Sequence, residues 1–434
     1  RNNKKSNKFW FAITLFKSIL KYVLPNKITM KKYTIFEGCQ SISSRYFSSY
    51  LRFFINIFFI HFADFHKKFI LKRQMEDAEK RAMFMAEQVW ANEEHMYCTV
   101  LPRLRRHTNT DLPLPRLYYS DAEIMVMEDL KDAGYYMADR MTGMDLEHSL
   151  LNIALFHASS LAMQRLDPEI FNIMKTNLKH PYTGPKGSEM GAFFIRHGIQ
   201  DATALIKSEN PNEKYTKVLE CLDHIEKKKE YYISLLQTPS DSDLTVLIHG
   251  DLWVNNILFS HDRNTNKPNL VKFVDFQATR IGSIATDLLH FIYTSIEPNT
   301  RKKYFDVLLK FYYDNLVSYL ESFLGSEDKD YVKAITLSRI IDEITKYRMY
   351  GLINAILVLP VVVCDPKTMS VIKILNGSNN NVILNEIKKN AHSVKVMLYM
   401  RSVYLFLLRH IFTYLDNYGI FVKKTNNLIF DFYS

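Results

Sequence analysis

Short apolar stretches separated by charged residues mark the first third of the chain. Residues 44–57 (SRYFSSYLRFFINI) are rich in aromatic and β-branched residues, residues 67–72 (KKFILK) are an apolar run between charges, and residues 123–130 (EIMVMEDL) are another run that leaves into a loop. Runs of this length and composition are typical of β-strands. Residues 74–98 lack Gly and Pro and carry Ala, Met, Glu and Lys, which predicts a helix among these strands.

The pattern becomes helical after residue 130. Residues 145–163 place apolar side chains on one stripe at helical spacing, and His157 lies on that stripe, where we expect it to be part of the core. Two apolar runs, 244–250 and 270–276, flank the segment NILFS, which predicts paired strands around a loop. Helices dominate again from Lys302 onward. This order predicts an α+β protein with two lobes of different class.

The charge of the chain is concentrated at its amino-terminal end. The 434 residues carry a net charge of +10, but residues 1–73 hold 15 Lys/Arg and 2 Asp/Glu, and the rest holds 41 and 44. The main body therefore lacks the basic excess of a nucleic-acid-binding protein, and we expect no nucleic-acid partner. The basic segment either binds an anionic partner or is a solvated tail. With 47% hydrophobic residues, the composition excludes a disordered chain.

Cysteine spacing and apolar segments bear on the compartment. The four cysteines, Cys39, Cys98, Cys221 and Cys364, are far apart and form no C-x-x-C pair, which suits the reducing cytoplasm. The start of the chain loosely resembles a signal peptide but has no cleavage site, and the apolar run 51–63 is too short to span a bilayer. We expect a cytoplasmic monomer without stable membrane insertion. Because the chain begins with Arg rather than Met, we also expect a fragment.

The residues with the clearest chemical meaning lie at 249–259 (HGDLWVNNILF) and 273–277 (FVDFQ). Asp251 is followed by Asn256 five positions later, and Asp275 follows an apolar strand. Phosphoryl transfer needs one carboxylate to orient and deprotonate a hydroxyl, and it needs oxygen ligands for Mg²⁺. This spacing predicts Asp251 in the first role and Asn256 and Asp275 in the second. The alternative is an Asp-rich hairpin turn without catalysis.

The order His-x-Asp-x-x-x-x-Asn, followed by an apolar run that ends in Asp-Phe, resembles the kinase catalytic loop and metal motif. Gly250 stands where protein kinases have Arg, and Asp287 follows Asp275 by only 12 residues, which leaves no room for a long activation segment. The short version resembles the aminoglycoside and choline kinases. The residue sequences of the two motifs are similar to those of the choline-kinase-like (CHK) group of ecdysteroid kinases. The resemblance covers residues 65–422 well and 30–64 poorly.

This resemblance implies a two-lobed protein-kinase-like fold. Residues 31–129 would form a small antiparallel-sheet N-lobe and residues 130–422 a large, mainly helical C-lobe, between a basic tail (1–30) and a C-terminal tail (423–434). It also implies ATP and Mg²⁺ as cofactors. The residues whose roles it implies are Asp251 (catalytic), Asn256 and Asp275 (metal), Lys72 (phosphate), Glu93 (partner of that lysine), Met127, Glu128, Asp129 and Leu130 (adenine-binding hinge), and His249 and Asp287 (support of the catalytic loop).

The sequence departs from the family pattern at the expected glycine-rich lid over the phosphates. The nearest candidate, Glu37–Phe53, contains only Gly38. Because glycines let backbone N–H groups approach phosphate, either the lid is degenerate or residues 1–60 include misread sequence. Two functions follow. One is an ATP- and Mg²⁺-dependent phosphotransferase that acts on a hydroxyl of a small molecule, such as an ecdysteroid or similar lipophilic alcohol. The other is a catalytically impaired pseudokinase-type binding protein of the same fold.

Overall fold

The computed structural model describes residues 32–36, 54–62, 65–74, 78, 81, 85–138, 144–181, 184–208, 216–237, 242, 244–261 and 268–362. The predicted tails, the lid candidate at residues 37–53 and any helix beyond residue 362 lie outside the described residues.

The amino-terminal part forms a five-stranded antiparallel sheet with the order β1-β2-β3-β5-β4. Its strands are β1 (Lys32–Phe36), β2 (Phe54–Phe62), β3 (Phe65–Arg73), β4 (Leu117–Ser120) and β5 (Ile124–Glu128). The strands predicted at 67–72 and 123–130 are confirmed as β3 and β5. Of the strand predicted at 44–57, only residues 54–57 are described, and they begin β2. In β3, Phe69 and Leu71 are buried on one face, so the alternation of a strand turns Lys72 to the other.

A continuous helical segment packs beside this sheet. It consists of α4 (Ala86–His95), the π-helical turn η1 (Met96–Val100) and α5 (Leu101–Thr108). The helix predicted at 74–98 is therefore confirmed in its second half, and it extends ten residues further than the composition indicated. π-Helical turns are rare, occur mostly as single turns within α-helices and are frequent at functional sites.

The rest of the described chain is mainly helical. Its helices are α6 (Leu146–Leu166), α7 (Pro168–Asn177), α8 (Gly184–Ser208), α9 (Thr216–Lys227), α10 (Lys229–Gln237), α11 (Ile284–Ser295), α12 (Pro298–Leu324), α13 (Lys329–Ala334), α14 (Leu337–Lys346) and α15 (Arg348–Val362). Asp145 caps α6 by accepting a hydrogen bond from the His148 N–H. Every residue of α11 is buried, which makes this helix the centre of the lobe. His157, on α6, is also fully buried, as the apolar stripe predicted.

Two small antiparallel sheets interrupt the helices, one of two strands (β7 and β10) and one of three (β6, β8 and β9). The strands are β6 (Tyr136–Met137), β7 (Thr245–Ile248), β8 (Ile257–His261), β9 (Pro268–Phe273) and β10 (Arg280–Ser283), with single 3₁₀ turns at Val254–Asn256 (η3) and Phe276–Ala278 (η4). The two predicted runs are confirmed as the strands β7 and β9, but they do not pair with each other, because β9 pairs with β8 and β7 pairs with β10. The strand β10 was missed because it has only four residues, RIGS, and no alternation of polar and apolar positions.

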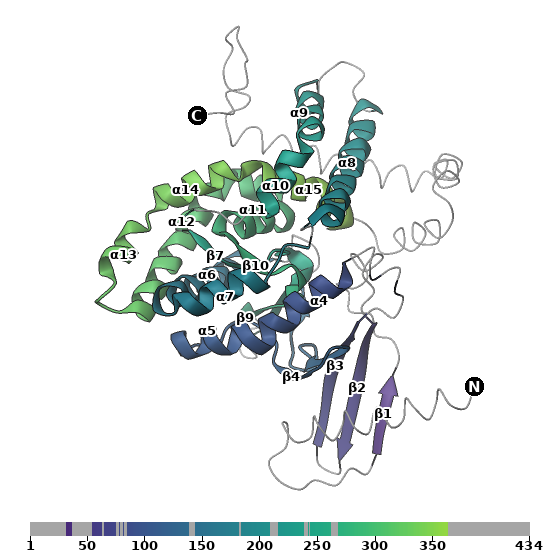
Figure 1. The fold of residues 1–434 in the computed structure, drawn as a ribbon, viewed down its shortest axis with the longest axis vertical. Helices are drawn as coiled ribbons and strands as arrows, with labels where there is room; N and C mark the ends of the chain where they lie inside the picture. The colour runs from purple at the N-terminus through teal and green to yellow at the C-terminus, as the bar shows by residue number, and fades with distance from the viewer. Residues whose placement is uncertain are drawn as a thin grey trace, which may run out of the picture.

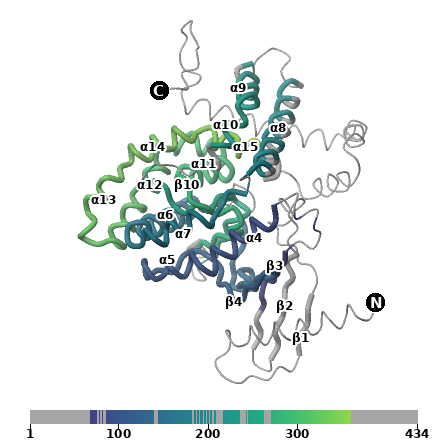
Figure 2. The backbone as a smooth tube through the Cα atoms, viewed as in Figure 1, coloured from purple at the N-terminus to yellow at the C-terminus, as the bar shows by residue number. Residues whose placement is uncertain are grey.

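Figure 1 shows the sheet of β1, β2 and β3 at one end of the molecule, with the helices α6, α11 and α12 gathered in a larger body and α4 between them. Figure 2 follows the same path as a tube and shows α4 running on into α5 along that body. The predicted α+β architecture with a small sheet lobe and a large helical lobe is confirmed. No helix in the described ranges is long and apolar enough to cross a membrane.

Candidate active site

The loop after β7 carries the first predicted site residues and is shaped by Gly250. This glycine has a φ of +81°, in the region that favours glycine. A Cβ at this position would lie 2.2 Å from the backbone oxygen of Ala278 and 2.6 Å from the side chain of Arg280. Any larger side chain would therefore push the loop away from the segment that follows Asp275. This contact gives a physical reason for Gly250 where protein kinases have Arg.

His249 joins the two loops that carry the predicted catalytic and metal-binding residues. Its buried ring donates a hydrogen bond from Nε2 to the Val274 carbonyl (3.0 Å), and its Nδ1 accepts one from the Asp251 N–H (3.3 Å). Burial lowers the pKa of His249, although the Asp287 carboxylate opposes the shift. The ring is thus neutral at pH 7, with its proton on Nε2, and it links the Asp251 loop to the residue before Asp275.

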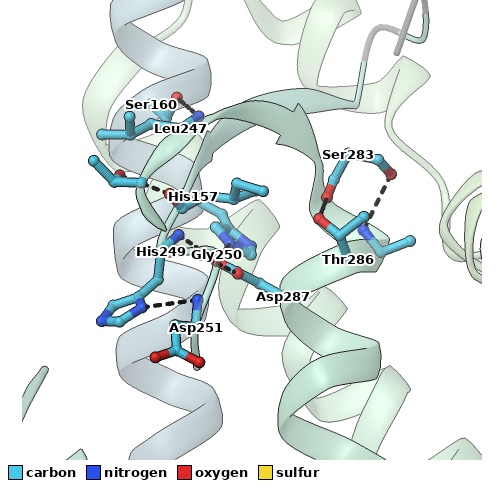
Figure 3. A network of polar contacts seen from close by, with 12 residues as sticks. His157, Ser160, Leu247, His249, Gly250, Asp251, Ser283, Thr286 and Asp287 are labelled. Carbon is cyan, nitrogen blue, oxygen red and sulfur yellow. Dashed lines mark hydrogen bonds and ion pairs between the residues drawn. The ribbon is translucent and has the colours of Figure 1, made fainter. Parts of the chain in front are cut away.

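Asp287, on α11, fixes the same loop from the opposite side (Figure 3). Its carboxylate accepts hydrogen bonds from the N–H groups of His249 (2.7 Å) and Gly250 (2.9 Å) and from Nε2 of His157 (3.2 Å). The Tyr312 hydroxyl lies 2.7 Å from the other ring nitrogen of His157. Burial alone would raise the pKa of Asp287, but the hydrogen bond and charge of His157 and the contacts with the loop lower it overall. Asp287 is therefore an ionised, buried carboxylate that holds the loop after β7 in place through hydrogen bonds.

Asp251 and Asn256 face each other across the turn η3. The Asn256 amide nitrogen donates to the Asp251 backbone oxygen (2.8 Å) and to its carboxylate Oδ2 (3.0 Å). The Asp251 side chain is 14% exposed, so it borders the surface. Burial, followed by the Asp275 carboxylate, raises the pKa of Asp251 to about 7. A carboxylate with this pKa can take a proton near neutral pH, which suits a general base.

Asp275 meets the sheet lobe through Lys72. Its backbone is in the left-handed region (φ 70°, ψ 63°), one of few such non-glycine positions in the described ranges. Its Oδ1 lies 2.9 Å from Nζ of Lys72, and its Oδ2 accepts a hydrogen bond from Gln277 (3.3 Å). The Lys72 ammonium also pairs with the buried Glu93 carboxylate on α4. Burial opposes the charge of Lys72, but the carboxylates of Asp275 and Glu93 outweigh it and raise its pKa.

Helix α4 is held against the Asp275 loop by contacts that sequence reasoning missed. The Asn92 amide nitrogen donates to the backbone oxygens of Gln277 (3.1 Å) and Lys179 (2.7 Å). The rings of Tyr97 and Phe276 meet edge to face, with centroids 5.9 Å apart. Asn92 directly precedes Glu93, so the same helix turn that presents Glu93 to Lys72 is fixed to the loop after Asp275. The motif in the sequence gave no signal for Asn92, because amide side chains are common on helix surfaces.

The predicted hinge connects the sheet lobe to the helical lobe. The N–H of Glu128 is bound to the Arg116 carbonyl, and the carbonyls of Asp129 and Leu130 accept bonds within the following turn. The Glu128 carboxylate pairs with Lys272 of β9 (2.7 Å), which ties the hinge to the helical lobe. The Asp129 carboxylate caps the turn by accepting hydrogen bonds from the N–H groups of Lys131 and Asp132. Met127 and Leu130 are buried and apolar, and the Leu130 N–H donates no backbone hydrogen bond to another of the described residues.

The donor set fits a magnesium ion only together with phosphate. No group of three or more His, Cys, Asp or Glu side chains that could hold a metal occurs in the part of the chain that the structure describes. Mg²⁺, however, is usually held by one or two protein groups and completed by phosphate oxygens and water. Both hydrogen bonds of Asn256 use its nitrogen, so its amide oxygen is not consumed by them. The Asp275 carboxylate is 30% exposed and offers the second hard oxygen ligand.

The sequence matches the ecdysteroid kinase-like family model over residues 44–324, about two thirds of the chain. The chain belongs to the ecdysteroid kinase-like family. The matched region of this ecdysteroid kinase-like protein contains every residue of the site described above, from Lys72 to Asp287. It also includes Glu37–Phe53 in part, where the lid was expected. None of the curated proteins matches the chain.

Solved structures that resemble this ecdysteroid kinase-like protein include two small-molecule kinases. A choline kinase from Cryptosporidium parvum Iowa II has 13% sequence identity and a TM-score of 0.45, and the match covers 94% of this chain and 98% of that one. An ethanolamine kinase from Plasmodium vivax has 13% identity and a TM-score of 0.39, with 93% and 85% covered. Identities this low do not identify a substrate.

In this ecdysteroid kinase-like protein, two further residues lie near the Asp251 loop that the sequence motif did not indicate. His290 lies one turn after Asp287 on α11, and its Nε2 is 3.9 Å from Oδ1 of Asp251. Arg280, at the start of β10, is buried beside Gly250 and donates to the Ala278 carbonyl (3.0 Å). The only signal in the sequence was the three-residue spacing between Asp287 and His290, which places both on one helix face.

Proposed function

We propose that this chain transfers the γ-phosphate of ATP to a hydroxyl of a small molecule, with Asp251 as the base. The observation that carries the proposal is the convergence of Asp251, Asn256 and Asp275 on one site that Lys72 of the sheet lobe also reaches. These four groups come from three segments of the chain, and no structural need for so many charges at one place is evident. A site for a magnesium-bound triphosphate uses all of them.

Asp251 would act on the acceptor. Its carboxylate accepts the proton of the acceptor hydroxyl as the hydroxyl oxygen forms a bond to the γ-phosphorus and the bond from that phosphorus to the β-phosphate oxygen breaks. The pKa of about 7 supports this role, because the base is largely ionised above neutral pH and still has appreciable affinity for a proton. Asn256 holds the carboxylate in position through its contact with Oδ2.

Lys72, Asn256 and Asp275 would act on the nucleotide. The Lys72 ammonium, oriented by Glu93, would bind phosphate oxygens, and the oxygens of Asn256 and Asp275 would hold Mg²⁺. Magnesium held there would neutralise the negative charge of the phosphates during transfer. The buried apolar side chains of Met127 and Leu130, with the Leu130 N–H, suit an adenine ring at the hinge.

We further propose an ecdysteroid or similar lipophilic alcohol as the acceptor, because the chain belongs to the ecdysteroid kinase-like family. The choline and ethanolamine kinases of similar fold make two amino alcohols the natural comparison compounds. The proposed ATP and Mg²⁺ dependence does not rely on which of these acceptors is used, since nucleotide and acceptor contact different residues.

The proposal is tested by incubating the chain with γ-labelled ATP and MgCl₂ and one of three acceptors: 20-hydroxyecdysone, choline or ethanolamine. We expect a labelled phosphate ester with at least one of them, and none from an Asp251→Asn variant prepared in the same way. Mg²⁺-dependent ATP binding without transfer to any acceptor would instead support the catalytically impaired binding protein. Neither binding nor transfer would contradict both functions.

A further inference from the structure

His290 is a buried polar side chain without a partner in the part of the chain that is described. Its residue is 2% exposed, and neither ring nitrogen makes a hydrogen bond there. Buried polar side chains nearly always have at least one hydrogen-bond partner, so an orphaned imidazole calls for an explanation. One such explanation is a ligand that supplies the partner when it binds.

The surroundings of His290 point to the predicted active site. Its Nε2 lies 3.9 Å from Oδ1 of Asp251, which is too long for a hydrogen bond. The ring of Tyr350, on α15, meets the imidazole edge to face with centroids 6.5 Å apart. Asp287, on the same helix, favours the charged imidazole, whereas His249 and Arg280 oppose it. His290 thus lies beside Asp251 of the catalytic loop and beside the aromatic ring of Tyr350.

The imidazole is held in its neutral form. Burial, opposed by the Asp287 carboxylate and reinforced by His249 and Arg280, lowers the pKa of His290 to about 3. A neutral imidazole has one N–H donor and one acceptor nitrogen. Asp251 is an acceptor when ionised, so a neutral His290 with its proton on Nε2 would present a donor towards the same point as the Asp251 carboxylate.

We propose that His290 and Asp251 hold the acceptor hydroxyl between them, with Nε2–H of His290 donating to the hydroxyl oxygen and Oδ1 of Asp251 accepting its proton. This inference rests on the proposed function. A hydroxyl oxygen about 2.8 Å from both atoms would bridge the 3.9 Å separation with an angle of roughly 90° at the oxygen. A hydroxyl can satisfy this geometry, because its lone pair and its O–H point in different directions.

His290 then has a defined role in the transfer. The hydrogen bond to the hydroxyl oxygen orients one lone pair towards His290, so that the other is free to attack phosphorus while Asp251 removes the proton. Holding a reacting group in one orientation is a main source of rate enhancement. The residue would contact the acceptor rather than the nucleotide, because its ring lies beside Asp251, the proposed base, and the ring of Tyr350.

Three variants test this role: His290→Leu removes both ring nitrogens, His290→Gln keeps an N–H donor near the Nε2 position, and Thr294→Val is the control. Thr294 lies one turn further on α11 and its buried hydroxyl donates to the His290 carbonyl, so its loss perturbs the same helix turn without touching Asp251. The measurements are kcat and KM for ATP and for whichever of 20-hydroxyecdysone, choline and ethanolamine the wild-type chain phosphorylates.

We expect His290→Leu to lower kcat/KM for the acceptor by about tenfold or more while the KM for ATP stays within about twofold. His290→Gln should recover part of the loss, and Thr294→Val should stay near the wild-type values. An acceptor kcat/KM in His290→Leu that matches the wild type, or an equal loss in Thr294→Val, would overturn the inference alone. A wild-type chain that phosphorylates no acceptor would overturn the proposed function and this inference together.

Urea unfolding separates this role from a structural one without any acceptor. Replacing an unsatisfied buried imidazole by an apolar side chain of similar size removes a desolvation cost. We therefore expect the unfolding midpoint of His290→Leu to equal or exceed that of the wild type. A clear fall in the midpoint, together with unchanged transfer by His290→Gln, would assign His290 to the core instead.

Discussion

The Nζ of Lys72 lies 2.9 Å from Oδ1 of Asp275, although the two residues are 203 positions apart in the sequence. Lys72 comes from the sheet lobe and Asp275 from the loop after β9 in the helical lobe. The same ammonium pairs with Glu93 on α4, so one cation joins three parts of the structure. Nearly all of the Lys72 side chain is buried, and both carboxylates form ion pairs with its ammonium.

Lys72→Met should weaken both the fold and nucleotide binding. The variant leaves the buried Glu93 carboxylate without its cation, and breaking a buried pair in this way costs about 3–5 kcal/mol in the free energy of unfolding. Urea unfolding measures this cost, and ATP titration measures the loss of affinity. Lys68→Met is the matched control. Lys68 lies on the same strand face, but its pair with Asp132 is 43% exposed on the lysine side, so we expect little change in the free energy of unfolding. Equal effects of the two variants would contradict the role of Lys72.

Asp251→Asn should remove activity and retain nucleotide binding. The amide cannot accept the acceptor proton, and loss of a general base lowers turnover by about 10²–10⁴-fold. The lysine and the two metal ligands are untouched, so the Kd for Mg²⁺-ATP should stay within about threefold. Single-turnover transfer and equilibrium titration measure the two quantities separately. Activity equal to that of the wild type would exclude Asp251 from the mechanism.

The pH dependence of the reaction should report Asp251. Its ionised form is the active one, and burial together with Asp275 raises its pKa to about 7. The kcat/KM for the acceptor should therefore rise with pH through about 7 and then level off. A profile that is flat between pH 6 and pH 8 would contradict the assignment.

The same pKa predicts that the stability of the fold falls as the pH rises, whereas the activity increases. The folded-state pKa lies above the unfolded value of 3.8, so the folded protein binds the proton more tightly between about pH 4 and pH 7. The contribution of Asp251 to stability is present below pH 4 and is lost as the pH rises to about 7. Asp251→Asn should therefore be more stable than the wild type at pH 8, by at most about 4 kcal/mol, and less so at pH 5. Urea unfolding at both pH values measures the difference.

Gly250→Ala should disrupt the catalytic loop, whereas Gly134→Ala should be tolerated. Both glycines have positive φ, so each alanine costs about 1–2 kcal/mol in backbone strain. The two differ in their surroundings, since a Cβ at Gly250 would lie 2.2 Å from the Ala278 backbone oxygen, whereas a Cβ at Gly134 would meet no atom of the described residues within 4 Å. We expect a loss of about 3 kcal/mol or more for Gly250→Ala, and loss of transfer activity. Equal unfolding midpoints for the two variants would be inconsistent with this packing.

Much of the site followed from the sequence because its residues lie in short motifs. The five-residue spacing of Asp251 and Asn256 and the apolar strand before Asp275 placed both loops correctly, and the 21 residues between Lys72 and Glu93 fit a strand followed by a helix. The strand alternation explains how Lys72 can be buried on the face opposite Phe69 and Leu71. Local patterns of this kind are visible in one sequence because each requires only neighbouring residues.

The contacts made by distant residues could not be predicted. His290 lies on a helix that is buried on all sides, so the apolar pattern of α11 does not reveal which face meets the catalytic loop. The partner of β7 was mistaken because four-residue strands carry too little pattern to compete with the longer β9. The left-handed backbone of Asp275 was also not predicted, because a single residue in this conformation leaves no pattern in the sequence, although aspartate adopts it more readily than most residues.

The central claim is tested most directly by measuring ADP, inorganic phosphate and phosphate ester together in one reaction of the wild-type chain with ATP and the acceptors named above. We predict that ADP and ester form in equal amounts in the presence of Mg²⁺ and that neither forms when EDTA removes it. ADP accompanied only by inorganic phosphate, or ester formation that is indifferent to EDTA, would contradict a site in which Asp251, Asn256 and Asp275 direct a magnesium-bound phosphate to an alcohol.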